Sequence, residues 1–181
     1  MGDYCGNCCN GGTEGEERRT VRLKFLREQL LYDVKNYAYV EADVMGEDKQ
    51  HAQHVLADIG EEGNVDRVSR ILAVVHTSVI EMLYPYTKEE PVEEELDDRL
   101  YEPDEYVVEM SVPVSMSRTT IRHLSRLIHE YMVYCVLADW LAITNPSAAA
   151  NWSAKAQATE DEIGRVKNYR RKTLTRKTHP W

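Results

Sequence analysis

The feature that most constrains the fold of this chain is a run of 13 residues, Tyr131–Ile143, in which Asp139 is the only charged residue. Upstream of this run, apolar residues recur at three- and four-residue steps, which predicts a helix capped by Ser117 that extends from Arg118 to about Thr144. Within the run, apolar side chains also fill the remaining faces of that helix. A helix that is apolar all round is buried all round. We therefore expect either the central helix of a bundle or a helix whose second face meets another subunit.

The apolar run leads into a predicted helix corner, "WLAITNPSAAANW", which begins at Trp140 and ends at Trp152. Asn145 and Pro146 supply an N-cap and a first-turn proline, so a second helix should start at once and continue to about Lys172. Two tryptophans beside a tight turn are typical of local packing. We expect them to clamp the corner rather than to form a ligand cage.

Three segments before this helix pair also have helical spacing. The pattern predicts a helix from Thr20 to about Tyr37, a short helix in "KQHAQHVLADI", and a long helix from Val65 to Tyr84 with Asn64 as its N-cap. At 181 residues, the chain is long enough for one domain with its own core. No apolar stretch is long enough to cross a bilayer as a helix, and the start of the chain lacks a signal-peptide pattern.

An acidic, proline-containing segment, residues 85–117, interrupts the helices. Apolar and polar residues alternate from Tyr106 to Val114, which predicts a strand, and Pro113 suits a sheet edge. The predicted fold is therefore mainly α: a small helical bundle with a long acidic β-hairpin or loop insertion and extended terminal arms. The expected divisions are an N-terminal extension over 1–19, a helical domain over 20–171 and a basic arm over 172–181.

Charge is strongly separated along the chain, although the net charge is -9. Residues 89–109 contain eleven acidic side chains and one basic one, whereas residues 163–181 contain seven basic side chains and no acidic one. Such segments suit contacts with other copies or other partners, and plain solvation is the alternative. Asp139, if buried, would need a partner from the tail or a neighbouring subunit; otherwise it faces water. The candidate interface residues are Glu93, Glu94, Glu95, Asp97, Asp98, Arg170, Arg171, Lys172, Arg176, Lys177 and Trp181.

The sharpest candidate for chemistry is "CGNCC", which contains Cys5, Cys8 and Cys9. Two cysteines at this spacing are half of a tetrahedral zinc site, and His51 and His54 are weak candidates to complete it. A tail with reduced thiols is the alternative interpretation. The "HEYMV" segment lacks the second histidine of a zinc-protease helix, and no nucleophile elbow or phosphate-binding loop is found. We therefore predict no catalytic activity and no cofactor.

The segment "MSRTTIRHLSRLIHEYMVYCVLADWLAITNPSAAANWSAKA", Met116 to Ala156, resembles the head-to-tail connector proteins of tailed bacteriophages, also called adaptor or neck-ring proteins. The resemblance is to the versions in phages of gut Bacteroidetes. It lies in the Thr-Thr helix start, the His-Glu-Tyr centre, the "LADWL" exit, the Thr-Asn-Pro corner and the Trp-x-x-Lys second helix. This segment covers about a quarter of the chain.

The resemblance implies a virion protein at the head-tail interface, assembled in the host cytoplasm. Its partners would be other copies of itself in a ring, commonly of twelve, together with the portal protein and a tail or second neck-ring protein. Genome DNA would pass through the lumen without sequence-specific binding, and no membrane is involved. Two alternatives remain: another helical neck, tail-completion or portal-associated protein of the virion, and a cytosolic regulatory protein that depends on zinc or thiols.

Overall fold

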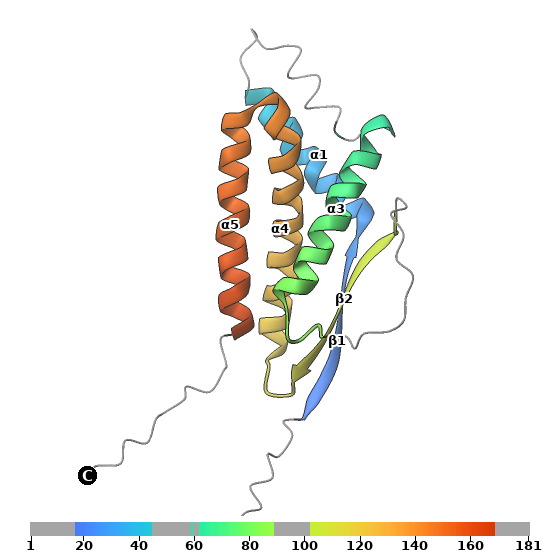
Figure 1. Ribbon diagram of the computed structural model, residues 1–181, viewed down its shortest axis with the longest axis vertical. Helices are drawn as coiled ribbons and strands as arrows, with labels where there is room; N and C mark the ends of the chain where they lie inside the picture. The colour runs from blue at the N-terminus through green and yellow to red at the C-terminus, as the bar shows by residue number, and fades with distance from the viewer. Residues whose placement is uncertain (1–16, 45–58, 60–61, 89–101, 169–181) are drawn as a thin grey trace, which may run out of the picture.

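The computed structural model describes residues 17–44, 59, 62–88 and 102–168. These residues form four helices and a two-stranded antiparallel sheet, which confirms the mainly α fold (Figure 1). Within this part of the chain, no helix has the length and apolar character needed to cross a membrane. The elements are β1 (Arg18–Leu26), α1 (Arg27–Val44), α3 (Glu62–Met82), β2 (Glu105–Pro113), α4 (Arg118–Thr144) and α5 (Pro146–Asn168).

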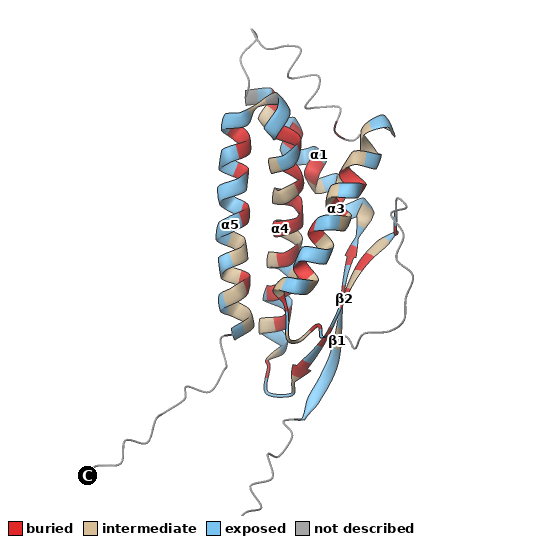
Figure 2. Ribbon diagram, in the orientation of Figure 1, coloured by how far each residue is buried: buried red, intermediate tan, exposed pale blue. Residues whose placement is uncertain are grey.

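Helix α4 is the centre of the structure. It packs against α1, α3 and α5, and its apolar run supplies a large share of the fully buried side chains (Figure 2). The apolar faces of α4 are therefore covered mostly by helices of the same chain, as expected for a central helix. The apolar run alone is thus no longer a reason to expect a second subunit against α4. The α4 side chains with no exposed surface are Ile128, Met132, Val133, Val136, Leu137 and Leu141.

The prediction of a helix from Thr20 was wrong, because residues 18–26 form the strand β1. Val21 and Phe25 lie four residues apart and fit a helix, but with Leu23 they also fit the two-residue period of a strand. Burial alternates along the strand with the two-residue period. Leu23 and Phe25 are buried, whereas Arg22 and Lys24, which precede each of them, are exposed. Helix α1 begins only at Arg27.

The predicted strand in the acidic insertion is present as β2, and its partner among the described residues is β1. The two strands are antiparallel, with Arg18 opposite Pro113 and Leu26 opposite Glu105. On the inner face of β2, Tyr106, Val108 and Met110 are buried in the core. The insertion is thus tied to the start of the domain by a long-range pairing.

Several helix boundaries match the prediction and others differ slightly. Ser117 caps α4, where its Oγ accepts a hydrogen bond from the Thr120 backbone N–H at 3.1 Å. Helix α3 begins at Glu62, so Asn64 lies in its first turn and is not its N-cap. Of the predicted short helix, only Ile59 lies within the described residues, and it is buried.

The central position of α4 predicts a large difference between two truncations on the same helix. Leu137→Ala removes a fully buried side chain and should lower the free energy of unfolding by about 2–5 kcal/mol. Ile143→Ala removes a side chain that is 71% exposed and should change it by less than about 0.5 kcal/mol. Urea denaturation followed by circular dichroism measures both, and equal effects would contradict the central role of α4.

Candidate functional site

The helix corner between α4 and α5 is built around Asn145. Its backbone N–H donates to the Leu141 carbonyl at 2.8 Å, which ends α4. Its side-chain Oδ1 accepts from the Ala148 N–H at 3.3 Å and from the Ser147 hydroxyl at 2.8 Å, which caps the start of α5. Pro146 is the first residue of α5, as predicted. One residue therefore ends one helix and starts the next, which fixes their antiparallel arrangement.

Trp152 joins α5 to α1 and α4. Its indole N–H donates to Glu41 Oε1 at 3.0 Å, and its ring lies 5.2 Å from the ring of Tyr37 and 5.5 Å from that of Tyr134. The Lys155 ammonium lies 3.7 Å from the ring centroid on α5 itself. This arrangement buries the indole while its N–H keeps a hydrogen-bond acceptor.

Trp140 has a different set of neighbours. The Arg67 guanidinium of α3 lies over its ring, 5.4 Å from the centroid, and also binds Asp139 Oδ2 at 2.9 Å. The side chain of Asp139 is 51% exposed, so it faces water and takes its partner from its own chain. The two tryptophans thus fasten α4 to α3 and α5 to α1. Trp152 also contacts Tyr134 of α4, and the expectation that both tryptophans clamp the turn itself stays a prediction.

A polar seam between α1 and α4 was not predicted from the sequence. The Asp33 carboxylate and the His129 imidazole lie 2.7 Å apart, and the rings of Tyr37 and Tyr134 meet edge to face at 6.2 Å. Burial raises the pKa of both phenols, and the Glu130 carboxylate raises both further. Asp33 lies on α1 and His129 on α4, so their contact joins these two helices.

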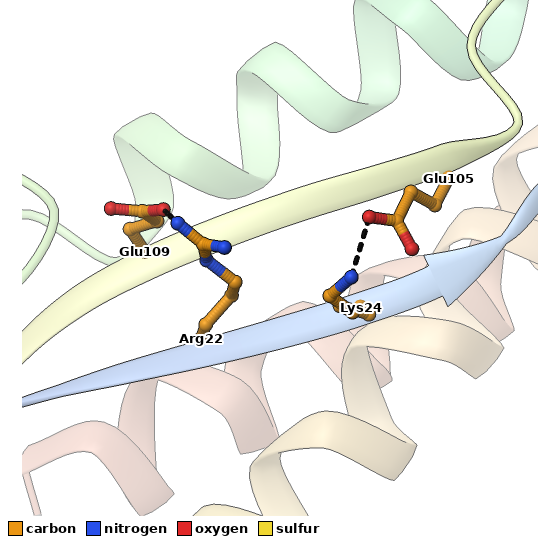
Figure 3. A network of polar contacts seen from close by, with 4 residues as sticks. All are labelled: Arg22, Lys24, Glu105 and Glu109. Atoms are coloured by element: carbon orange, nitrogen blue, oxygen red, sulfur yellow. Dashed lines mark hydrogen bonds and ion pairs between the residues drawn. The ribbon is translucent and has the colours of Figure 1, made fainter.

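The outer face of the β ribbon carries cross-strand ion pairs (Figure 3). Arg22 pairs with Glu109, and Lys24 Nζ lies 2.6 Å from Glu105 Oε1. Such exposed pairs contribute about 0–1 kcal/mol each. Arg22 lies directly opposite Glu109 and Lys24 is the diagonal neighbour of Glu105, and opposite charges in these positions favour this register. The end of the acidic segment is therefore neutralised by β1 within the same chain.

A groove of about 730 Å³ opens between α3 and α5, and we call it the α3–α5 groove. The Thr77 and Ser78 hydroxyls donate to carbonyls of their own helix, each at 3.1 Å. Burial raises the pKa of the Tyr131 phenol at the groove, and the Glu160 carboxylate raises it further. The groove thus combines apolar surface with carboxylates. Its lining residues are Val74, Thr77, Ser78, Glu81, Met82, Tyr131 and Glu160.

The other predicted sites lie outside the described residues. This holds for the cysteines at 5, 8 and 9, the histidines at 51 and 54, and all candidate interface residues from Glu93 to Asp98 and from Arg170 to Trp181. Within the described part of the chain, no group of three or more His, Cys, Asp or Glu side chains is arranged to hold a metal ion. The zinc and interface hypotheses therefore stay predictions.

Comparison of the chain with protein families, curated proteins and solved structures finds no match. The resemblance to connector proteins therefore depends on the segment Met116–Ala156. In the fold, this segment forms α4, the corner and the start of α5.

The double role of Asn145 can be tested against a second asparagine on the same helix. Asn145→Ala removes the cap of α5 and should lower the free energy of unfolding by about 0.5–2 kcal/mol. Asn151→Ala, at an exposed interior position of α5, should leave stability unchanged or raise it slightly, because alanine favours helix. Denaturant titration of both variants makes the comparison, and equal effects would contradict the capping role.

The raised tyrosine pKa values predict a loss of stability in alkali. Above the ordinary tyrosine pKa of about 10, the unfolded chain loses protons that the folded chain retains, so the free energy of unfolding falls as pH rises. Tyr134→Phe should make this decline shallower, because the substituted ring cannot ionise. Tyr39→Phe, at a side chain that is 66% exposed, is the control. Denaturation between pH 8 and pH 11 tests this, and an unchanged slope for Tyr134→Phe would contradict it.

Proposed function

We propose that this chain is a structural protein of a tailed-phage virion that forms an oligomeric ring of the head-tail connector, between portal and tail. The observation that carries the proposal is the segment Met116–Ala156, whose helix, Thr-Asn-Pro corner and second helix resemble those of connector proteins. In the fold, this segment is the central helix α4, the Asn145 corner and about the first half of α5. The resembling residues are thus the ones on which the bundle is built.

The separated charges support a ring of identical copies. A ring requires that one patch on a subunit meets a different patch on the next, because a patch that meets its own copy closes at two. The chain carries oppositely charged segments at residues 89–101 and 169–181, which are suited to such unlike contacts. The ring would contact the portal on one side and a tail or second neck-ring protein on the other.

The net charge of -9 fits passage of DNA without adhesion. Proteins bind DNA phosphates through lysine and arginine, and the affinity for DNA grows with the number of counterions that these contacts release. A predominantly acidic subunit gives little such binding. We propose that the protein works through shape and assembly, without catalysis or a cofactor, and that DNA crosses the lumen without sequence-specific contacts.

The mass of the native assembly tests this proposal. We expect the purified protein to form a closed species whose mass is a whole-number multiple of the 20.9 kDa chain, either alone or, once the mass of the portal is subtracted, in complex with its portal. Native mass spectrometry and sedimentation velocity both measure it. A strictly monomeric protein, even in the presence of its portal, would overturn the proposal. One copy bound per portal subunit without contacts between copies would indicate a portal-associated protein instead.

A further inference from the structure

The α3–α5 groove has the composition of a peptide-binding surface rather than that of a reaction site. Val74 is 68% exposed at the groove, and Met82 and Tyr131 add further apolar surface. The hydroxyls of Thr77 and Ser78 already donate to their own helix, so they offer no directed donor to a small ligand. An occupant would therefore bind through apolar contact and through charge.

The charge of the groove is negative. Glu81 and Glu160 line it from opposite helices, and Glu81 forms no ion pair with any described residue. The Glu160 carboxylate accepts a 3.4 Å hydrogen bond from Gln157 and forms no ion pair with any described residue. Two carboxylates without a cationic partner beside apolar surface fit a basic segment that also carries apolar side chains.

The chain itself contains such a segment directly after α5. Residues 169–181 include five lysines or arginines, no acidic side chain, and the apolar residues Tyr169, Leu174 and Trp181. Extended, these residues span about 45 Å, whereas the 21 residues of α3 are about 31 Å long. The segment is therefore long enough to reach an adjacent copy and to follow its groove.

Helix α5, which precedes the segment, ends beside the end of α3. Lys167 Nζ donates to the Tyr84 carbonyl at 3.0 Å and also to the Met82 carbonyl, and the Tyr86 hydroxyl donates to the Lys167 carbonyl at 3.2 Å. These contacts hold the last turn of α5 against the end of α3. Docking into its own groove would require a sharp reversal just after Asn168. Residues 165–179 contain no glycine or proline to favour that turn, which points to the groove of another copy.

We propose that the α3–α5 groove binds the basic C-terminal segment, residues 169–181, of a second copy of this chain. The contact joins unlike patches, so it propagates from copy to copy and closes where the rotation permits. This contact adds to the proposed function a specific interface between adjacent subunits. It rests on that function only in that the contacts close into a ring. The binding itself can be measured whether or not the assembly belongs to a virion, so the two proposals fail separately.

The first test uses two full-length variants and a synthetic peptide of residues 169–181. In the arm-reversed variant, Arg170, Arg171, Lys172, Arg176 and Lys177 are each replaced by Glu, which leaves the groove intact but removes the competing basic segment. We expect the labelled peptide to bind this variant saturably, as measured by fluorescence anisotropy, and more weakly at high salt. Adding Glu81→Lys and Glu160→Lys should weaken binding at least tenfold. Adding Asp66→Lys and Asp161→Lys, at exposed positions on the same helices, should change it less than twofold.

The second test separates docking between copies from docking within one chain. The groove-reversed variant, Glu81→Lys with Glu160→Lys in an otherwise unchanged chain, should be monomeric, as should the arm-reversed variant. Mixing the two above the dissociation constant of the peptide should restore association in sedimentation, because complementary arms and grooves meet. Circular dichroism of each variant checks that the fold is retained. Equal peptide binding with and without the groove reversal, or no association on mixing, would overturn the proposal.

Discussion

The burial of the middle of α4, where Met132, Val133, Val136 and Leu137 have no exposed surface, is the constraint on which the rest of the structure depends. A helix with apolar side chains around its whole circumference must be enclosed, and this chain encloses it with α1, α3 and α5. Each enclosing helix is also fixed by a polar contact at its border with α4 or α5. Arg67 holds α3 through Asp139, Asp33 holds α1 through His129, and Glu41 meets the indole of Trp152. Apolar burial supplies the driving force, and these directional contacts select one arrangement of the helices.

The β ribbon completes the core where the helices leave it open. The inner faces of β1 and β2 add Phe25, Tyr106, Val108 and Met110 to the same apolar cluster. On the outer face, the ion pairs to Glu105 and Glu109 use the last part of the acidic segment. The acidic segment therefore has two parts. Its final residues stabilise the strand register, whereas the acidic residues between 89 and 101 lie outside the described part of the chain.

Local patterns in the sequence predicted the elements whose stabilising contacts are local. Ser117 and Asn145 bond to backbone groups within three or four residues, so their roles were visible in the sequence. Strand β1 was missed because Val21 and Phe25 fit both periods. The choice was made by pairing with β2, whose paired residues lie about 80 to 95 positions away in the sequence. The separate roles of the two tryptophans and the groove carboxylates depend on three helices meeting, which no local pattern contains.

The closed environment of α4 also decides where partners can bind. Since most of the apolar run is buried within one chain, α4 offers little apolar surface to an assembly apart from Ile143 near its end. An assembly would therefore use the other exposed surfaces of the bundle, which are charged or only partly apolar. Interfaces of this kind gain specificity and association rate from charge complementarity, while their affinity depends on a few apolar anchors. The exposed Val74 lies beside Glu81 and Glu160, which have no ion-pair partner among the described residues, so the α3–α5 groove has both features in one place. This is the groove to which we propose that the basic segment with Trp181 binds. Contacts that are individually weak suit a subunit that folds alone and associates only when several arms engage at once, because each further contact then forms at a high effective concentration.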